Sequence, residues 1–225
     1  SPVAKNMINT FFFNLNAIKS GQSRPKDVPK YKPQKVGILG AGMMGAGIAY
    51  AQASRGIATV LKDVSLEKAE HGKAYSQKLT QSRVDKGRMN PHDQTALLGR
   101  ITPTADVADL KGCELIIEAV FENRELKAKV TQEAEPLLAE GGFFASNTST
   151  LPISGLAQAS KRPEKLVGIH FFSPVDKMKL VEIIRGETTD DETVARAFDY
   201  VLALGKLPIV VNDSRGFYTS RTFGT

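Results

Sequence analysis

One histidine and one glutamate stand in apolar segments where titratable side chains are unusual. His170 lies in GIHFFSP and Glu182 lies in KLVEIIRG. The other two histidines, His71 and His92, have polar neighbours, and we expect them to be solvated. A carboxylate bound to one imidazole nitrogen fixes the tautomer and stabilises the protonated ring. The second ring nitrogen is then free to act as a general base.

The segments around these residues predict strands that would place them side by side. Residues 166–172 and 180–184 are apolar runs, and residues 173–179 between them read as a connection. A histidine in an apolar strand is more often a core residue without chemistry, and the nearby Glu182 is what favours the catalytic interpretation. Ser149, in ASNTST, is a third candidate, because it also follows a predicted strand, where doubly wound sheets bind ligands.

A glycine-rich motif early in the chain predicts a dinucleotide site. Residues 35–63 read as a strand, a turn, a helix and a second strand, with G-x-G-x-x-G spacing in the turn. The first glycine permits the tight turn, the second leaves room for a pyrophosphate, and the third lets the helix approach its strand. The candidate cofactor-binding residues of this unit are Gly40, Gly42, Met43, Met44, Gly45 and Asp63.

The acid at the end of the second strand bears on the choice of cofactor. Asp63 stands where a carboxylate can bind both hydroxyls of an adenosine ribose. A carboxylate there repels a 2′-phosphate, which favours NAD over NADP. Beside a nicotinamide, His170 would remove the proton of an alcohol while hydride leaves the same carbon. We expect no metal site.

The alternation of strands and helices predicts the fold class. It indicates an α/β fold of the Rossmann type, with a doubly wound, mostly parallel sheet and helices on both faces. In this fold the candidate residues collect where the strands end. The predicted strands are 36–39, 57–61, 100–104, 115–120, 143–146, 166–172, 180–184 and 209–211, and the predicted helices are 48–54, 66–88, a helix starting at Asn90-Pro91, 124–138 and 191–204.

The first 34 residues form a segment ahead of the predicted domain at 35–225. Residues 1–20 predict an amphipathic helix, and residues 21–33, with three prolines among lysines, predict a semi-rigid linker. The helix either docks on another domain or caps this one. Its apolar residues at helical spacing are Ile8, Phe11, Phe12, Leu15 and Ile18.

The net charge of +6 belongs to this leading segment. Residues 1–35 hold seven cations and one acid, whereas residues 36–225 hold 23 of each. Since no basic stripe with interleaved aromatics is present, we expect no nucleic-acid binding. Cys113 is the single cysteine, which excludes an internal disulfide and fits a reducing compartment. The sequence has neither an apolar run of ~20 residues nor a signal-peptide pattern, so we expect no membrane span and no secretion.

Five ordered motifs resemble the 3-hydroxyacyl-CoA dehydrogenase family, and most closely the dehydrogenase part of the multifunctional α subunit of fatty-acid β-oxidation. They are GAGMMG, IIEAVFEN, ASNTST, GIHFFSPVDKMKLVEII and VVNDSRGFYTSR. The resemblance covers essentially the whole chain. It implies NAD-dependent oxidation of an (S)-3-hydroxyacyl-CoA to a 3-oxoacyl-CoA. The alternatives are another NAD-linked hydroxyacid dehydrogenase, which would be expected to use a lysine, and a non-catalytic NAD-binding module.

The resemblance implies roles for individual positions. His170 matches the catalytic histidine, Glu182 its acid partner, and Ser149 the serine that binds the substrate oxygen. Glu122 and Lys127, in FENRELK, match residues near the cofactor ribose and nicotinamide. A solvated helix start is the alternative interpretation of these last two.

The substrate contacts are less well defined. The phosphates of coenzyme A need cations, and the polar helix offers Lys78 and Lys86, although a solvated basic face explains them equally well. Ser173 stands where many single-function relatives have asparagine and many multifunctional relatives have serine. Ser220 stands where relatives often have an asparagine that contacts substrate, which leaves its role open.

The resemblance also implies neighbours for this chain. Such relatives carry an enoyl-CoA hydratase domain before the dehydrogenase NAD-binding part and an all-helical domain after it. Residues 1–34 resemble the helix and linker that follow the hydratase domain. We expect the all-helical domain to be absent here, so that the fragment binds NAD but turns over poorly. A thiolase subunit is a further partner by resemblance. The location would be cytoplasmic in a bacterium, and mitochondrial or peroxisomal in a eukaryote.

Overall fold

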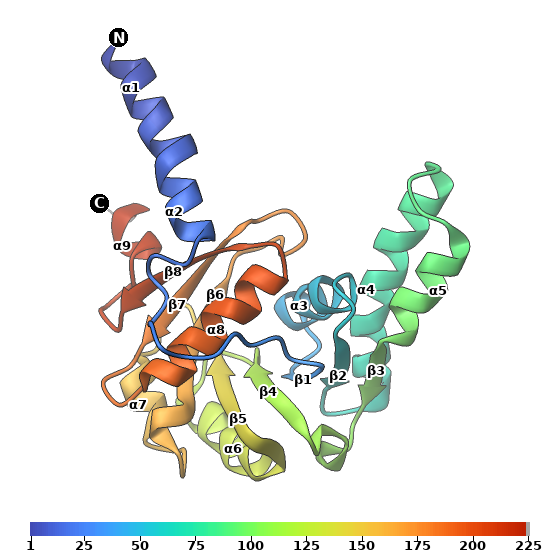
Figure 1. The fold of residues 1–225 in the computed structure, drawn as a ribbon. Coiled ribbons are helices and arrows are strands. Elements are labelled where there is room, and N and C mark those ends of the chain that lie inside the picture. Colours follow the sequence, from blue (N-terminus) through green and yellow to red (C-terminus); the bar gives the residue numbers. More distant parts are fainter. Residues whose placement is uncertain (224–225) are drawn as a thin grey trace.

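One sheet runs through the folded body and carries eight strands within the described residues (Figure 1). The structure is a computed structural model that describes residues 1–223, except for the side chains of residues 11, 12 and 223. The strand order is β3-β2-β1-β4-β5-β6-β7-β8. The strands are β1 (Lys35–Leu39), β2 (Ala58–Lys62), β3 (Ile101–Thr104), β4 (Cys113–Glu118), β5 (Leu138–Ser146), β6 (Leu166–Phe171), β7 (Leu180–Arg185) and β8 (Leu207–Asn212).

The sheet is parallel from β3 to β6 and changes direction after β6. β7 pairs with β6 in antiparallel fashion, and β8 runs parallel to β7. The order β3-β2-β1-β4-β5 is that of a Rossmann-type sheet, with the reversal of winding between β1 and β4. The predicted fold class is therefore confirmed. The ends of the parallel strands meet at one edge, and the connection from β6 to β7 turns at the same edge.

Helices cover both faces of the sheet, which explains why its strands read as continuous apolar runs. Along β4, Leu115 and Ile117 belong to the core beneath α3 and α8, whereas Ile116 belongs to the core beneath α6 and α7. All three side chains are fully buried. The covering helices are α3 (Met43–Ala53), α8 (Asp191–Ala203), α6 (Arg124–Ala134) and α7 (Ile153–Ala157).

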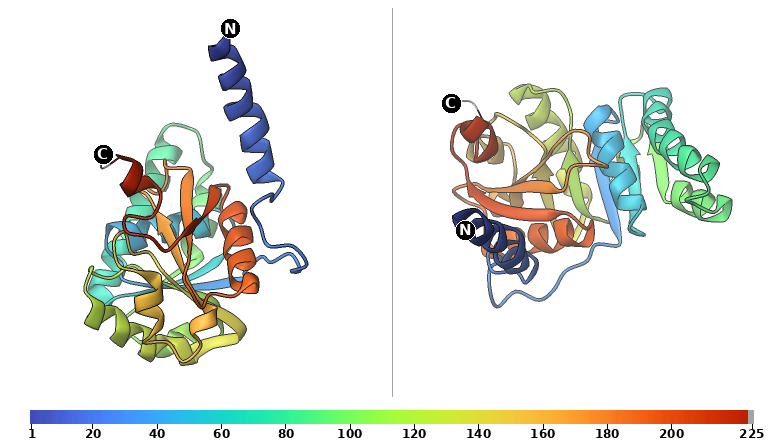
Figure 2. Two further views of the ribbon diagram at one scale, coloured as in Figure 1. Left: turned by 90° about the vertical axis from the view of Figure 1, so that its left-hand side faces the viewer. Right: turned by 90° about the horizontal axis from the view of Figure 1, so that it is seen from above.

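Two helices form a hairpin that projects from the β3 end of the sheet, away from the N-terminal helix (Figures 1 and 2). Asn90 accepts a hydrogen bond from the His92 N–H, so the predicted helix start at Asn90-Pro91 is confirmed. The long polar helix stops short of its predicted end at 88, just before Gly87, which has φ +63°. The two helices are α4 (Leu66–Asp85) and α5 (Pro91–Gly99).

The N-terminal helix stands off the domain and neither α1 nor α2 has a buried residue (Figure 2). Sequence patterning predicts one helix over 1–20, whereas the structure has a π-helical segment between two α-helical ones. Ile8 and Phe13 are more than half exposed. Phe11 and Phe12 of the predicted stripe lie outside the described side chains. The segments are α1 (Pro2–Ile8), η1 (Asn9–Asn14) and α2 (Leu15–Lys19).

The proline-rich linker is anchored to α8 rather than free. The Arg24 guanidinium pairs with the Asp199 carboxylate, with Nε 2.8 Å from Oδ1, and also donates to the carbonyls of Val28 and Pro29. The Tyr31 N–H donates to the second oxygen of Asp199. Prolines alone predict a spacer. The anchor is missed because it joins residues 175 positions apart.

Two short helices also escape prediction, because their stability depends on distant contacts. α7 begins where the Asp213 carboxylate accepts hydrogen bonds from the N–H groups of Ile153 and Ser154. α9 (Thr219–Phe223) begins beside Glu182. In the part of the chain that the structure describes, no helix combines the length and the apolar character that a bilayer crossing requires.

Candidate active site

The glycine turn between β1 and α3 leaves an open space in front of the helix. Gly40 has φ +95°, a conformation that favours glycine. A Cβ atom on Gly45 would lie 1.8 Å from the Gly40 carbonyl oxygen, so the helix touches the turn only because Gly45 has no side chain. At Gly42, by contrast, an added Cβ atom would meet no heavy atom of the described residues within 4 Å, its neighbours in the chain aside. α3 begins at this point without a side-chain cap, and the N–H groups of an uncapped helix start suit a pyrophosphate.

Asp63 follows β2 and is hydrogen-bonded to the glycine turn. One carboxylate oxygen accepts from the Ala41 N–H at 2.7 Å and the other from the Val64 N–H at 2.7 Å. Each oxygen keeps a lone pair for a further donor. The side chain is half-buried, so its charge remains accessible at the sheet edge.

His170 and Glu182 are direct neighbours across β6 and β7. Their Cα positions are paired in the antiparallel register, and Nδ1 of His170 lies 2.8 Å from Oε2 of Glu182. An ionised carboxylate accepts only, so Nδ1 carries the proton and Nε2 is the basic nitrogen. Nε2 makes no hydrogen bond with the residues that the structure describes. The ring packs beside Phe172 and Phe217, at centroid distances of 4.5 and 6.0 Å.

Glu182 is fully buried, and four donors keep it ionised. Besides His170, it accepts hydrogen bonds from the Tyr218 N–H, the Thr219 N–H and the Thr219 hydroxyl. Burial alone would raise the pKa of Glu182, but the hydrogen bonds from His170 and Thr219 outweigh this and lower it. A charged Glu182 stabilises the imidazolium that forms when His170 takes a proton.

The loop after β5 runs beside His170. Asn147 accepts a hydrogen bond from the Phe171 N–H at 2.9 Å, which ties this loop to the strand of the histidine. Ser149 is exposed two residues further on. It makes no direct hydrogen bond to His170 in the described structure. The loop therefore brings Ser149 to the same edge of the sheet and leaves its hydroxyl accessible.

Glu122 organises the loop that carries Ser149. Its Oε1 accepts from the N–H groups of Ser149 and Thr150, at 3.0 and 3.1 Å, and from the hydroxyls of Thr148 and Thr150. Burial acts to raise the pKa of Glu122, but the hydrogen bond from the Thr148 hydroxyl and the charge of Lys127 outweigh it and lower the pKa to about 2. Glu122 is thus hydrogen-bonded to the loop of Ser149, although its residue is exposed just ahead of α6.

Lys127 is 2% exposed and lies between two carboxylates. Its ammonium is 2.8 Å from Glu118 and 3.2 Å from Glu122. Glu118, at the end of β4, also accepts a hydrogen bond from the Ser146 hydroxyl. Glu118 therefore links the ends of β4 and β5, and Lys127 joins it from the first turns of α6. The ammonium of Lys127 is already held by protein carboxylates.

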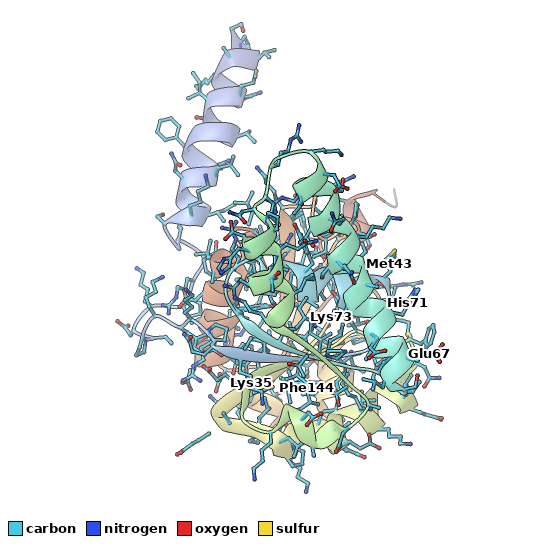
Figure 3. All side chains as sticks on the ribbon, turned by 90° about the vertical axis from the view of Figure 1, so that its right-hand side faces the viewer. Lys35, Met43, Glu67, His71, Lys73 and Phe144 are labelled. Atoms are coloured by element: carbon cyan, nitrogen blue, oxygen red, sulfur yellow. The ribbon has the colours of Figure 1, made fainter. Side chains whose placement is uncertain are left out.

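Ser173 lies in the connection between β6 and β7, against the start of α3. Its hydroxyl is 3.6 Å from the sulfur of Met43, which is 70% exposed at the start of the helix. Figure 3 shows Met43 on the same side of the molecule as α4. Met44, the next residue, packs partly buried against the core. The structure thus brings Ser173 next to the glycine turn.

The cations proposed for coenzyme A lie farther out on the projecting hairpin. Lys78 and Lys86 are exposed on or directly after α4. The helix packs against the glycine turn at Gly72, where a Cβ atom would lie 2.6 Å from the Ala41 carbonyl oxygen. In Figure 3, His71 and Lys73 lie along the same helix. The helix that carries or precedes these lysines packs against the turn, but no contact joins the lysines to His170 within the described residues.

Three positioning residues were not found from the sequence. Glu118 is hidden at the end of an apolar run, Asn147 reads as part of a polar loop, and Thr219 lies 37 positions from Glu182. A sequence signal exists only for Glu118, which is a carboxylate at the end of a predicted buried strand, as in LIIEAV.

The arrangement combines a nucleotide-binding turn with a general base at one sheet edge. The open space at Gly42, the start of α3 and Asp63 fit the phosphates and ribose of a dinucleotide. His170 has one nitrogen held by an acid and one free. These residues can hold a dinucleotide and take a proton from a substrate bound beside it.

Comparisons with known proteins agree with this geometry. A sequence model of the family described as 3-hydroxyacyl-CoA dehydrogenase, NAD binding domain, matches residues 35–214. The chain is 38% identical to (S)-3-hydroxybutyryl-CoA dehydrogenase from Ralstonia eutropha, with a TM-score of 0.82, covering 85% of this chain and 68% of that chain. It is 32% identical to 3-hydroxybutyryl-CoA dehydrogenase from Escherichia coli, with a TM-score of 0.79, covering 83% of this chain and 39% of that one.

A multifunctional protein is also similar. The dehydrogenase part of multifunctional enzyme 1 from C. elegans is 27% identical, with a TM-score of 0.74, over 89% of this chain and 48% of that chain. The chain thus spans about two thirds of the length of the Ralstonia enzyme and less of the other two. The chain belongs to the 3-hydroxyacyl-CoA dehydrogenase family of NAD-dependent oxidoreductases, and carries the family's NAD-binding domain.

Proposed function

We propose that this chain supplies the NAD-binding and proton-abstracting part of an enzyme that oxidises (S)-3-hydroxyacyl-CoA to 3-oxoacyl-CoA in fatty-acid β-oxidation. The observation that carries the proposal is the His170–Glu182 pair, 2.8 Å apart at the edge of the sheet where the glycine turn lies. The names of the Ralstonia and Escherichia coli proteins support a 3-hydroxyacyl-CoA substrate. The C. elegans protein supports the assignment to a multifunctional enzyme.

In this mechanism Nε2 of His170 takes the proton of the substrate 3-hydroxyl. The Nδ1–H of His170 donates a hydrogen bond to Glu182, which stays ionised and so lowers the cost of forming the imidazolium in a buried position. The hydroxyl of Ser149 hydrogen-bonds the same substrate oxygen, and Ser173 lines the nicotinamide side. The glycine turn and Asp63 would hold NAD, which would supply the acceptor for the hydride of carbon 3. General-base catalysis of this kind contributes ~10²–10⁴-fold to the rate.

The cofactor and coenzyme A occupy different elements in this proposal. Gly40, Gly42 and Gly45, with Met43 and Met44, form the pyrophosphate site, and Asp63 binds the adenosine ribose. Glu122 and Lys127 lie near the nicotinamide ribose, where Glu122 also shapes the Ser149 loop. The exposed ammonium groups of Lys78 and Lys86 bind coenzyme A phosphates.

The division into residues 1–34, a linker segment, and residues 35–225, the NAD-binding domain, is part of the same proposal. A hydratase domain would precede this chain and a helical domain would follow it, with a thiolase subunit as an outside partner. Without the helical domain the acyl chain is not held near the nicotinamide, and such orientation contributes ~7–11 kcal/mol to a barrier. The chain alone should bind NAD and turn over slowly.

Two measurements test the proposal. Titration calorimetry of the chain with NAD should show saturable binding. Reduction of acetoacetyl-CoA by NADH should proceed in a protein that joins this chain to its helical domain, and His170→Gln should lower kcat by ~10²-fold or more. His92→Gln, an exposed histidine on α5, is the matched control and should keep the full rate. A His170→Gln protein with normal kcat would overturn the assignment.

A further inference from the structure

Lys206 is a buried lysine that the proposed chemistry does not use. It follows Gly205 at the end of α8, and its residue is 8% exposed. In the described part of the chain no carboxylate forms an ion pair with it. Burial lowers the pKa of the Lys206 ammonium, Asp176 acts to raise it, and the nearby Arg55 lowers it further. An ammonium kept in such a place needs a reason, because burying an unpaired charge is costly.

The partners of this ammonium are two main-chain carbonyls in the connection between β6 and β7. Nζ of Lys206 lies 2.5 Å from the Val175 oxygen and 2.6 Å from the Met178 oxygen. Between these two carbonyls the chain turns, since the Pro174 oxygen accepts from the N–H groups of Lys177 and Met178. Lys206 therefore donates hydrogen bonds to carbonyl groups on both sides of one turn.

The same connection touches the nucleotide-binding helices on its other side. Val175 packs against Gly47 of α3, where an added Cβ would lie 2.9 Å from the Val175 side chain. The Tyr75 hydroxyl on α4 donates to Asp176 at 2.9 Å. The connection thus lies between the end of α8 and the helices α3 and α4, which surround the glycine turn (Figure 1).

The position of this connection matters to the proposed chemistry. It begins directly after the strand of His170, and it places Ser173 against Met43 at the start of α3. A shift of the connection would move both His170 and Ser173 relative to the glycine turn. A misplacement of ~1 Å far from the reacting atoms can cost ~10²-fold in rate.

We propose that Lys206 is a positioning residue for the reaction, which holds the β6–β7 connection against α3 so that His170 and Ser173 keep a fixed distance from the nicotinamide. The proposal rests on the function proposed above for His170. It requires an ammonium or a similar multiple donor, because a neutral alkyl group would remove the donor from both carbonyls, of which the Val175 contact is buried and the Met178 contact is partly buried.

The test compares Lys206→Met, Lys206→Arg and Lys177→Met in a protein that joins this chain to its helical domain. Lys206→Met should lower kcat by ~10²-fold with a smaller change in KM, while the Kd for NAD changes by less than about twofold, because Asp63 and the glycine turn do not touch Lys206. Lys206→Arg, which keeps several donors, should recover most of kcat. Lys177→Met, an exposed lysine of the same connection, should behave as wild type. A normal kcat in Lys206→Met overturns the proposal.

A second readout does not depend on turnover. Hydrogen exchange of the Lys177 and Met178 amides, measured with NAD present, should accelerate in Lys206→Met and not in Lys177→Met. Unchanged exchange would also overturn the proposal. If wild type shows no turnover, or His170→Gln is fully active, the proposed function fails, whereas the exchange result still decides whether Lys206 holds the connection.

Should Lys206→Met not fold, Tyr75→Phe provides the alternative variant. It removes one exposed hydrogen bond that holds the same connection from α4. It should lower kcat severalfold and leave the Kd for NAD unchanged. Wild-type kcat together with wild-type amide exchange in Tyr75→Phe would overturn the idea that this connection must be held in place.

Discussion

His170 and Glu182 face each other across two antiparallel strands, although they are 12 positions apart in the sequence. The strand pairing itself sets the distance between the imidazole and the carboxylate. The four hydrogen bonds at Glu182 then fix the carboxylate. A base held in this way is preorganised before any substrate arrives.

Replacing Glu182 by glutamine should abolish most of the activity and leave cofactor binding intact. The amide cannot stabilise an imidazolium as a carboxylate does, so we expect kcat to fall by ~10²–10⁴-fold. Stopped-flow or steady-state assays and NAD titration measure the two effects. Glu187→Gln, an exposed acid after β7, is the control and should be unaffected. Equal rates for the two variants would contradict the role of Glu182.

Replacing Asp63 by asparagine should weaken NAD binding and reduce the preference for NAD over NADP. The lost charge removes charge-assisted hydrogen bonds to the ribose, and we expect the Kd for NAD to rise about tenfold. Competition titrations with NAD and NADP give the ratio of affinities. Asp85→Asn, at the end of α4, should leave both affinities unchanged. An unchanged NAD affinity in Asp63→Asn would remove Asp63 from the ribose site.

Two lysines of α6 offer a matched test of the buried ion pair. Lys127 is 2% exposed beside Glu118, whereas Lys129 is 72% exposed and pairs with Glu133 on the same helix. Removing one partner of a buried pair costs about 3–5 kcal/mol, while an exposed i,i+4 pair contributes about 0.3–0.5 kcal/mol. Denaturant unfolding of Lys127→Met and Lys129→Met should show this difference. Similar free energies of unfolding would mean that the Glu118–Lys127 pair is not a structural unit.

The linker anchor predicts a pH-dependent stability. Burial acts to raise the pKa of Asp199, but the hydrogen bonds from Arg24 and Tyr31 lower it below its ordinary value. A carboxyl whose folded pKa is depressed stabilises the fold above its unfolded pKa of about 3.9, and this contribution is lost as the pH falls through the folded value. The difference in unfolding free energy between wild type and Asp199→Asn should therefore be largest near pH 7 and shrink below about pH 4.

Its control is Asp191→Asn, in the first turn of the same helix. Asp191 is 64% exposed and pairs with Arg185 on the surface, so the change in free energy should stay below about 1 kcal/mol. If the difference in unfolding free energy between wild type and Asp199→Asn stays constant from pH 7 to pH 3, the anchor acts by packing rather than by charge.

The parts of the fold that could be predicted are those set by local patterns. The glycine spacing, the apolar strands and the cap at Asn90 each have short-range causes, and all three are found in the structure. The β6–β7 pairing could be predicted because only seven residues, 173–179, join two apolar runs.

The parts that could not be predicted depend on residues far apart in the chain. Glu118 reads as the end of an apolar run, and only the fold shows that Lys127 reaches it. The Arg24–Asp199 pair and the Thr219 donors to Glu182 have no signature in their own neighbourhoods. Lys206 reads as a surface lysine after a helix, and its burial follows from the connection packed above it.

The antiparallel pairing of β6 and β7 restricts which insertions and deletions a descendant of this protein can tolerate. Side chains alternate between the two faces of a strand, so adding or deleting one residue inside β6 or β7 would send His170 and Glu182 to opposite faces. Single-residue length changes within these two strands should therefore be absent from active lineages, even where the surrounding amino acids diverge freely.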